Sequence, residues 1–379
     1  MMDFNPNQFA DACIQAIGEK IKSLNKLNII VAGKTGVGKS TLINSVFRAQ
    51  LADTGMGKPV TTHMRRISKP GIPLNIYDTR GFELGRDAQK EVKDEVVKAI
   101  KEGLASKDIN KAIHCIWYCI NTTSNRIEQE EIDWLRDFSA ENAVTQVPVI
   151  VVLTQAISKK NALAMKNAIL DENLDVIQVI PVLAADYEID EEFTKEAYGL
   201  DVLIQVMSAA LPDELQHTLQ NVQQVAIGEK KRYAQSVVAA SAAAAAATGA
   251  TPIPFADSAI LIPTQAAMIA SITAIFGLEV NKSLIMGFLS SVIGTGSATI
   301  AGKAVVANLI KLIPGAGTVA GGAISGTTAA LITTALGEAY ILLMEAVYKG
   351  ELTSQDLNTV KGREKMKQFL KQGLRRHPK

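Results

Sequence analysis

The residues with the clearest chemical purpose form a glycine-rich loop, GKTGVGKS, from Gly33 to Ser40. An apolar run, LNIIVA, precedes the loop at 27–32, and a segment with helical spacing, TLINSVF, follows it. Glycines allow successive backbone N–H groups to turn inward around phosphate oxygens, and the start of a helix adds its positive end. The spacing Gly-x4-Gly-Lys-Ser between a strand and a helix therefore predicts a phosphate-binding loop. A flexible glycine loop is the alternative.

Each position of this loop has an expected role. Lys39 is expected to reach the β- and γ-phosphates of a nucleotide, and the Ser40 hydroxyl is expected to bind Mg²⁺. The positions expected to contact the nucleotide are Gly33, Thr35, Gly36, Val37, Gly38, Lys39, Ser40 and Thr41.

A second motif, Asp78-Thr79-Arg80-Gly81, follows the apolar stretch LNIY. An Asp at a strand end can hold the water shell of Mg²⁺, and a Gly three residues later can offer its N–H to the γ-phosphate. The polar stretch 54–66, between the two motifs, contains threonines that could close over the γ-phosphate. An exposed turn is the alternative for DTRG by itself.

These three pieces, in this order and spacing, resemble the Era-type, translation-factor-class GTPases over about residues 27–211. The resemblance implies GTP and GDP as ligands and Mg²⁺ as cofactor. It identifies Thr62 as the switch-one threonine, with Thr61 as the near alternative, and Asp78 and Gly81 as switch two.

The resemblance therefore implies two overlapping sets of residues. The catalytic set is Lys39, Thr62 and Gly81. The metal-binding set is Ser40, Thr61, Thr62 and Asp78.

The motif that reads the base departs from the family pattern, Asn/Thr-Lys-x-Asp. Thr154 matches, but Gln155 replaces the Lys and Ile157 replaces the Asp that would pair with guanine. Ser158 or another side chain would have to substitute, or selectivity would be weaker. Ala184 or its neighbour Ala185 is the position whose backbone N–H could meet guanine O6.

Catalysis departs from the pattern as well. Phe82 occupies the place of the water-orienting Gln of Ras-like enzymes, and Gly36 occupies the place of the Asn of potassium-dependent relatives. We therefore expect slow hydrolysis unless a partner or self-association supplies a group. Arg65, Arg66 and Arg80 are candidates for such a group, and surface arginines are the alternative.

Strand and helix patterns alternate through the first half of the chain. Apolar strand patterns lie at 27–32, 74–77, 112–120, 147–153 and 177–183, and helical patterns lie at about 88–105, 127–138, 158–170 and 199–211. This alternation predicts an α/β domain with a mostly parallel sheet and helices on both faces. Residues 4–26 show helical spacing, and we expect them to pack on the domain that follows.

Charge density changes sharply along the chain. Residues 233–349 contain eight charged residues among 117, whereas 20% of the whole chain is charged. Uncharged stretches of 20 residues or more lie at 233–256, 258–278, 283–302 and 312–337. About 20 residues of helix cross a bilayer core, so these stretches predict an all-α domain that either enters a membrane or forms a buried bundle.

The last part of the chain is basic. Residues 361–379 contain eight Lys or Arg against Glu364 alone, with apolar residues at helical spacing. A basic amphipathic helix favours an anionic membrane surface, and a terminal helix docked on the protein is the alternative. Residues 230–347 also resemble an uncharacterised, Pro- and Gly-punctuated helical domain that follows Era-like GTPase domains in bacterial proteins, which implies membrane association.

These observations give five expected parts. They are an N-terminal helix at 1–26, a GTPase domain at 27–211, a connecting helix at 212–232, an apolar helical domain at 233–349 and a basic tail at 350–379. A net charge of +1 argues against a nucleic-acid binder that works by bulk charge. The chain has only three cysteines, and its first residues lack the basic segment followed by an apolar run that is typical of a secretory signal. Both observations favour a cytoplasmic protein.

We therefore expect a slow GTPase that acts as a nucleotide-dependent switch or assembly protein at the bacterial inner membrane, with self-association through its GTPase domain. One alternative is an ATP-binding protein or a nucleotide sensor with little hydrolysis, suggested by Gln155 and Ile157. The other is a soluble regulator whose helical domain binds a protein partner.

Overall fold

The computed structural model describes residues 6–48, 58–80, 86–124, 126–249, 258–293, 326–353 and 355–375. Contacts within the chain divide it into two compact units. We call Leu24–Ala226 the sheet unit, and we call Met1–Ser23 together with Ile227–Lys379 the helical unit.

The sheet unit is built on one seven-stranded sheet. Across the sheet the strands are β2 (Lys58–Pro59), β3 (Met64–Ser68), β4 (Leu74–Thr79), β1 (Leu27–Ala32), β5 (Cys115–Asn121), β6 (Val149–Thr154) and β7 (Gln178–Pro181). The five strands from β4 to β7 in this order run parallel, whereas β2 and β3 form an antiparallel edge. This arrangement confirms the expected P-loop α/β class.

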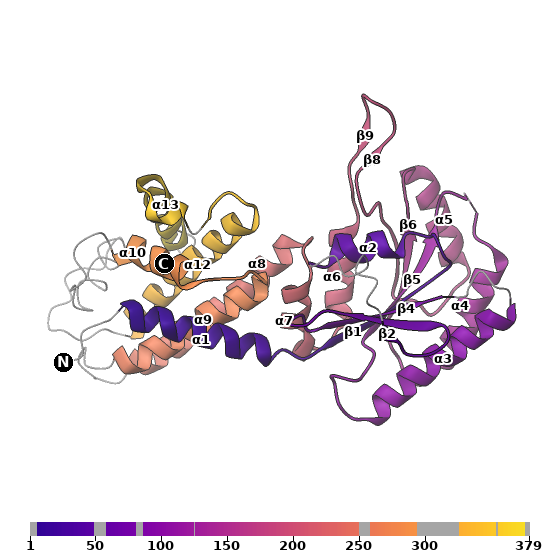
Figure 1. Ribbon diagram of the computed structural model, residues 1–379, viewed down its shortest axis with the longest axis horizontal. Helices are drawn as coiled ribbons and strands as arrows, with labels where there is room; N and C mark the ends of the chain where they lie inside the picture. Colours follow the sequence, from indigo (N-terminus) through magenta and orange to yellow (C-terminus); the bar gives the residue numbers. More distant parts are fainter. Residues whose placement is uncertain are drawn as a thin grey trace. The chain divides into compact units, whose positions relative to one another are not determined.

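Helices cover both faces of this sheet (Figure 1). One face packs against α2 (Lys39–Val46), α6 (Leu200–Ala210) and α7 (Asp213–Val222). The other face packs against α3 (Arg86–Ala105), α4 (Gln129–Asn142) and α5 (Lys159–Asp171). Because successive side chains of a strand point to opposite faces, Val31 belongs to the first core and Ile30 to the second. Every residue of β1 is therefore buried.

A two-stranded hairpin, β8 (Tyr187–Glu188) and β9 (Thr194–Lys195), interrupts the connection from β7 to α6. It extends away from the sheet (Figure 1). The sequence patterns did not predict this hairpin, because each strand is only two residues long.

The helical unit contains both ends of the chain. Its helices are α1 (Pro6–Lys22), α8 (Ile227–Gly249), α9 (Ser258–Phe276), α10 (Lys282–Ile293), α12 (Gly326–Tyr348) and α13 (Val360–Arg375), with a short 3-10 turn η2 (Asp356–Asn358). Phe9 and Cys13 of α1 lie buried in the core formed by α8, α9, α10 and α12. The expectation that the N-terminal helix packs on the GTPase domain is therefore wrong.

Close helix contacts in this unit depend on small residues. A Cβ atom added to Gly337 of α12 would lie 2.5 Å from a methyl group of Val238 on α8, so α8 and α12 approach closely. Three of the four uncharged stretches continue beyond the described residues: α8 ends at Gly249, α10 ends at Ile293, and α12 begins at Gly326.

The basic tail forms helix α13, whose apolar side packs on the helical unit. Met366 is fully buried in the helical core, and Phe369 packs partly buried against it. A Cβ atom added to Gly362 would lie 2.0 Å from the carbonyl oxygen of Asp356, so the start of α13 lies tightly against η2. The structure thus corresponds to the docked alternative for the tail.

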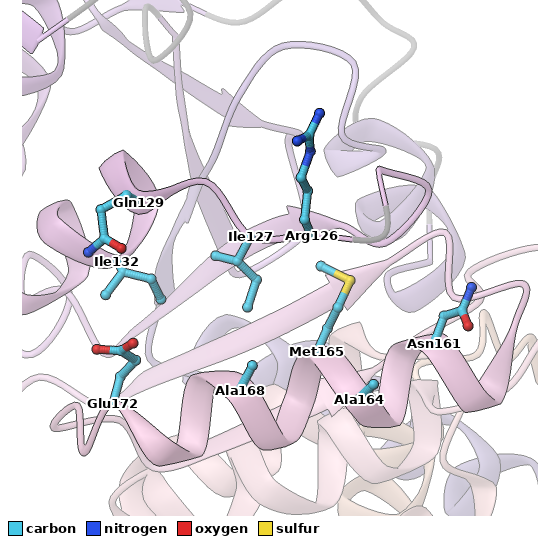
Figure 2. Close-up of a pocket in the computed structure, with 9 residues that line it drawn as sticks. All are labelled: Arg126, Ile127, Gln129, Ile132, Asn161, Ala164, Met165, Ala168 and Glu172. Atoms are coloured by element: carbon cyan, nitrogen blue, oxygen red, sulfur yellow. The ribbon is translucent and has the colours of Figure 1, made fainter.

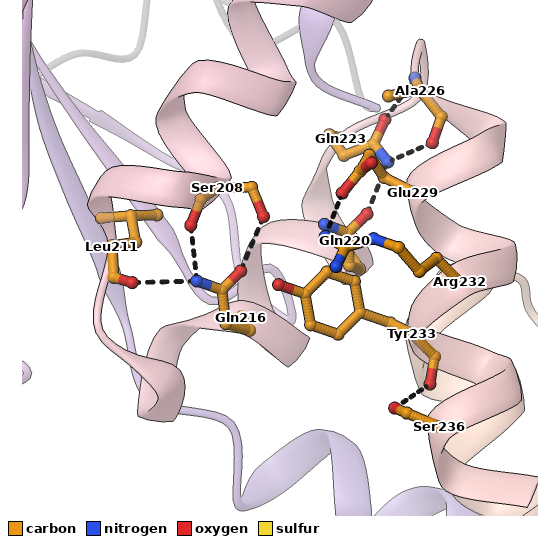
Figure 3. Close-up of polar contacts among 10 residues, drawn as sticks. All are labelled: Ser208, Leu211, Gln216, Gln220, Gln223, Ala226, Glu229, Arg232, Tyr233 and Ser236. Carbon is orange, nitrogen blue, oxygen red and sulfur yellow. Dashed lines mark hydrogen bonds and ion pairs between the residues drawn. The ribbon is translucent and has the colours of Figure 1, made fainter. Parts of the chain in front are cut away.

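The expected connecting helix over 212–232 is broken. α7 ends at Val222 and α8 begins at Ile227. The Gln223 side chain occupies the break: its Oε1 accepts hydrogen bonds from the backbone N–H groups of Val225 (2.8 Å) and Ala226 (2.9 Å), and its Nε2 donates to the carbonyl of Ala226 (3.1 Å; Figure 3). A side chain that satisfies the backbone locally competes with helix continuation.

Candidate nucleotide-binding site

The loop at 33–40 has the backbone shape that its glycines predict. Gly33, Gly36 and Gly38 have φ angles of 135°, 79° and 94°, a region that side-chain-bearing residues rarely adopt. Gly33 has a second constraint, because an added Cβ would lie 2.4 Å from the carbonyl oxygen of Cys119 on β5. Gly38 ends the loop, and α2 begins at Lys39. The loop is therefore a fixed, left-handed turn between β1 and α2.

The ammonium group of Lys39 folds back into this loop. Its Nζ donates to the carbonyl oxygens of Gly33 (2.6 Å) and Lys34 (2.9 Å). The side chain thus holds a positive charge inside the turn, and the loop residues Thr35, Gly36 and Ser40 are exposed. This geometry can bind the oxygens of a phosphate chain.

Asp78 lies at the end of β4, paired in register with Val31 of β1. Its carboxylate is buried, and burial raises its pKa, while the charges of Lys39, Arg65 and Arg80 oppose that rise. One carboxylate oxygen accepts a hydrogen bond from Arg65 (3.3 Å), whereas the other, Oδ1, is buried and has no hydrogen-bond partner among the described residues.

An unpartnered buried carboxylate oxygen costs free energy unless a ligand satisfies it. Oxygen donors are also the ligands that Mg²⁺ prefers, directly or through its water shell. Asp78 and the Ser40 hydroxyl therefore fit the Mg²⁺ that the motifs imply.

The structure distinguishes the two switch-one threonines. The Thr61 hydroxyl donates to the carboxylate of Glu95 on α3 and accepts from the N–H of Met64 (3.1 Å). The Glu95 carboxylate also accepts from the N–H of His63 (3.1 Å). The Thr62 side chain is exposed. Thr62 is therefore the threonine whose hydroxyl is available to a ligand in this conformation.

The base-reading motif is attached to the phosphate loop. The buried Thr154 hydroxyl contacts the carbonyl oxygens of Val37 (2.5 Å) and Ile120 (3.1 Å). Gln155 has a positive φ of 52°, and its Nε2 donates to the carbonyl of Gly36 (3.2 Å). The Gln155 carbonyl accepts from the Thr122 hydroxyl (2.8 Å). The sequence motifs at 33–40 and 154–155 therefore form one hydrogen-bonded site.

Ala184, the position expected to meet guanine O6, lies close to the Thr154-Gln155 motif. The N–H of Ala156 donates to the carbonyl of Val182 (3.1 Å), two residues before Ala184. Tyr198, which the sequence patterns did not single out, donates from its hydroxyl to the carbonyl of Ala156 (2.5 Å). Lys159 lies over the Tyr198 ring, 4.8 Å from its centroid. Because Tyr198 is 42 residues from Ala156, no local sequence pattern predicts this contact.

Some predictions are not supported or lie outside the described residues. Gly81 and Phe82 are not among the described residues. The hydroxyl of Ser158, considered as a substitute for the missing carboxylate, instead caps α5 by accepting from the N–H of Asn161 (3.3 Å). Ile157 is half-buried and offers no polar group to a base.

A separate pocket of about 640 Å³ lies between α4 and α5 (Figure 2). Arg126 and Glu172 line it together with apolar side chains such as Met165. None of the predicted nucleotide-binding residues lines this pocket.

The far end of α2 is hydrogen-bonded to the segment that leaves the sheet unit. The N–H of Arg48 donates to the carbonyl of Val222 (3.0 Å), and the N–H of Gln224 donates to the carbonyl of Val46 (2.8 Å). The Gln224 side chain also donates to the carbonyls of Asn44 (2.9 Å) and Ser45 (3.1 Å). The helix that begins at Lys39 thus ends on residues that lie just before Ile227.

Two family models match this chain. Residues 28–155 match the family described as "50S ribosome-binding GTPase", and residues 214–376 match "Domain of unknown function (DUF697)". The first match covers the phosphate loop, Asp78 and the Thr154-Gln155 pair, so it rests on the same residues as the site geometry.

Individual relatives are similar over part of the chain. "Neuronal-specific septin-3" from Danio rerio is 28% identical over 164 residues, which cover 37% of this chain and 45% of the relative. "Septin-14" from Homo sapiens is 23% identical over 205 residues, which cover 49% of this chain and 47% of the relative. The aligned region thus spans about half the length of these relatives.

Among solved structures, that of Cdc11 from Saccharomyces cerevisiae matches 44% of this chain and 70% of its own, with 18% identity. Its TM-score of 0.28 is too low to indicate a common overall arrangement.

The family matches and the site geometry agree on the sheet unit. It has a P-loop GTPase fold whose residues 28–155 match a GTPase family, and the helical region that follows matches DUF697 over residues 214–376. The similarity to septins does not single out the Era type as the closer relationship.

Proposed function

We propose that this protein is a slow GTPase that binds GTP with Mg²⁺ at the 33–40 loop and uses the bound state as a switch. The observation that carries the proposal is that Lys39 and Asp78 lie at the ends of two neighbouring strands, β1 and β4. The Lys39 ammonium lies inside the loop after β1, and at the end of β4 the buried Asp78 carboxylate has one oxygen that no described residue hydrogen-bonds.

In this proposal each group of the site has one task. Lys39 binds the β- and γ-phosphates, and the N–H of Gly81 meets the γ-phosphate. Ser40, Thr62 and Asp78 hold Mg²⁺, which supplies positive charge to the phosphate oxygens when bound. The chain supplies neither the Gln nor the Asn that related enzymes use in hydrolysis, because Phe82 and Gly36 stand at those positions. We therefore expect a low intrinsic rate that rises only when self-association or a partner adds a group.

Guanine selectivity rests on fewer contacts than in the family pattern. Thr154 and Gln155 join the motif to the loop, and Ala184 offers a backbone N–H, but Ile157 lacks the carboxylate that would accept from guanine N1–H and N2–H. This departure is the reason for the second candidate, an ATP-binding protein.

A base-selectivity experiment separates the two candidates. The affinities of the full chain for GTP and ATP with Mg²⁺ are compared in the wild type, in Ile157→Asp and in Ile157→Asn as the uncharged control. We expect the wild type to prefer GTP, and Ile157→Asp to raise GTP affinity by about tenfold without raising ATP affinity, because a carboxylate pairs with two guanine donors. A wild type that prefers ATP would overturn the proposal of a GTPase.

The switch part of the proposal follows the chain from the loop to the helical unit. A phosphate bound at Lys39 acts on the start of α2, and the end of α2 holds Val222 and Gln224 by hydrogen bonds. Residues 223–226 are not helical, so their backbone can change while α8 stays intact. Nucleotide state thereby acts on the entry to α8.

We place this action at the cytoplasmic face of the bacterial inner membrane. The low charge density of 233–349 and the basic tail support that location. Among the described residues, one stretch, Ala329–Tyr348, is long and apolar enough to cross a membrane, and 72% of it is buried within the protein. Membrane entry of α12 would therefore require the helical core to open.

Flotation of the full chain with anionic vesicles tests the location, with neutral vesicles as the control. We expect flotation with anionic lipid that weakens at high salt, because contacts of basic residues with lipid are screened. A chain that stays in the soluble fraction with anionic lipid at low salt would favour the alternative, a soluble regulator that binds a protein partner.

A further inference from the structure

The turn that carries the two neighbouring threonines is anchored to helix α3. One carboxylate oxygen of Glu95 accepts two hydrogen bonds, one from the Thr61 hydroxyl and one from the backbone N–H of His63 (3.1 Å). Thr62 lies between these two residues in the sequence. A single side chain of α3 therefore fixes the chain on both sides of Thr62.

Helix α3 holds this acceptor in a fixed position. Val96, next to Glu95 on α3, is buried in the same core as Met64, the first residue of β3. One turn earlier on α3, the Glu91 carboxylate lies 3.0 Å from Nε2 of His63. The turn is thus held at two points by a helix that is packed on the sheet, and such support gives a site residue a precise position.

The same turn is also tied to the strand end that carries Asp78. The N–H of Arg80, two residues after Asp78, donates to the carbonyl of His63 (2.8 Å). This bond continues the antiparallel pairing of β3 with β4. Thr62 is therefore one residue away from a backbone contact with the end of β4, where the proposed Mg²⁺ would bind.

The hydroxyls of the two threonines differ in what they already bind. The Thr61 hydroxyl gives its proton to Glu95 and accepts from the N–H of Met64 (3.1 Å), whereas the Thr62 side chain is exposed. We propose that Glu95 is a positioning residue that selects Thr62 over Thr61 as the threonine that binds Mg²⁺ and closes over the γ-phosphate. The Mg²⁺ role of Thr62 rests on the proposed function, whereas the anchoring of the turn by Glu95 does not.

Anchoring the turn before the ligand arrives lowers the cost of binding. A turn without this anchor has to be ordered when Mg²⁺ and the γ-phosphate bind, and the lost conformational entropy reduces the affinity. GDP has no γ-phosphate for the turn to close over. The loss of Glu95 should therefore weaken the binding of GTP with Mg²⁺ and leave the binding of GDP without Mg²⁺ unchanged.

Amide hydrogen exchange of the full chain without nucleotide tests the anchoring. We compare the wild type with Glu95→Ala, with Glu95→Gln, which keeps an acceptor oxygen, and with Glu102→Ala, which removes an exposed carboxylate from the same helix. Circular dichroism checks that each variant folds. We expect residues 60–64 to exchange about fivefold faster in Glu95→Ala and at the wild-type rate in the other two variants. Wild-type exchange in Glu95→Ala would overturn the proposal.

Nucleotide affinity tests the selection of Thr62. The affinities for GTP with Mg²⁺ and for GDP without Mg²⁺ are measured in the same variants, in Thr61→Val, in Thr62→Val and in Glu95→Ala/Thr62→Val. We expect Glu95→Ala and Thr62→Val each to weaken the binding of GTP with Mg²⁺ by about tenfold, and Thr61→Val to weaken it less. Glu95→Gln should bind as the wild type does. The double variant should bind no more weakly than Thr62→Val, because Glu95 acts through Thr62.

The outcomes separate this inference from the proposed function. A further loss of affinity in the double variant, or an equal loss for both nucleotides in Glu95→Ala, would show that Glu95 supports only the fold and would refute the selection. A larger effect of Thr61→Val than of Thr62→Val would refute it as well. If Thr62→Val binds GTP with Mg²⁺ as the wild type does, the proposed Mg²⁺ role of Thr62 fails and the selection fails with it. The exchange measurement then still decides whether Glu95 anchors the turn.

Discussion

The two units of this protein differ in how one buried charged side chain of each, Lys230 and Asp78, is satisfied. In the helical unit, the fully buried Lys230 donates to the carbonyls of Ile275 (3.0 Å) and Phe276 (3.3 Å), which end α9. The hydroxyls of Thr273 and Tyr340 bind each other at 2.8 Å. These buried polar groups have partners within the unit, and helix ends provide several of them.

In the sheet unit, polar groups gather at the ends of parallel strands. Lys39 is held by carbonyls of its own loop, and one oxygen of Asp78 has no hydrogen-bond partner within the part of the chain that the structure describes. This difference indicates which buried groups are suited to bind a ligand. Groups that are satisfied within the fold stabilise it, whereas a charged group beside an unsatisfied one marks a site that a ligand completes.

The largest expected effect comes from the tightest backbone position of the site. Gly33→Ala places a methyl group 2.4 Å from the Cys119 carbonyl at a φ of 135°, so we expect the sheet unit to lose about 4 kcal/mol of unfolding free energy. Both tryptophans, Trp117 and Trp134, lie in the sheet unit, so their fluorescence during urea unfolding reports on it alone.

Gly18→Ala is the control for that change. An added Cβ at Gly18 meets nothing within 4 Å, and the residue lies inside α1 of the helical unit. We expect no change in the fluorescence transition and a gain of about 0.5–1 kcal/mol in the helical unit, measured by circular dichroism. Equal effects of the two substitutions on fluorescence would contradict the geometry of the loop.

Lys230→Met tests the helical side of the comparison. The change removes both hydrogen bonds to the end of α9, and we expect a loss of about 3 kcal/mol in the helical transition seen by circular dichroism. Tryptophan fluorescence and nucleotide affinity should not change. Lys282→Met, which breaks an exposed ion pair with Asp11, should cost at most about 1 kcal/mol. A Lys230→Met protein as stable as Lys282→Met would show that the buried ammonium is not needed.

The smallest effect among these concerns pH. His114 is buried, and burial lowers its pKa from 6.5 to about 4, while its Nδ1 accepts from the N–H of Asn28 (3.0 Å). Because the unfolded state binds the proton more strongly, stability is full above pH 6.5 and is lost as pH falls towards 4. Between pH 7 and pH 5 the sheet unit should lose about 2 kcal/mol through this residue. His114→Asn keeps an acceptor without this titration, so an unchanged pH dependence in that variant would refute the assignment.

Much of the sheet unit was predictable because its signals are local. The run LNIIVA predicted β1 within its observed bounds, and the glycine spacing predicted the turn into α2. Cys115 and Cys119, four residues apart in the strand pattern at 112–120, lie buried on the same face of β5. Periodicity of apolar residues and glycine positions depend on neighbours in sequence, which a single sequence contains.

The predictions that failed concern contacts between segments that are far apart in the sequence. Phe9 and Cys13 showed that α1 has an apolar side, but not that this side packs on α9, more than 240 residues later. The break at Gln223 could not be read from helical spacing, because it depends on the bond from the Gln223 side chain to Ala226 and on backbone hydrogen bonds near the end of α2. In the site, Tyr198 and Glu95 were missed for the same reason, since only the fold brings them to Ala156 and Thr61.

The most direct test of the account is nucleotide binding by a matched pair of lysine variants. The affinity of the full chain for GTP with Mg²⁺ is measured by titration calorimetry in the wild type, in Lys39→Ala and in Lys69→Ala. Lys69 is an exposed lysine of the same unit at the turn between β3 and β4, so it controls for the loss of one charge. We expect Lys39→Ala to weaken binding by about 100-fold, because the loop loses its charged donor, and Lys69→Ala to bind as the wild type does. Equal GTP affinity in Lys39→Ala and Lys69→Ala would contradict the claim that this loop is the nucleotide site.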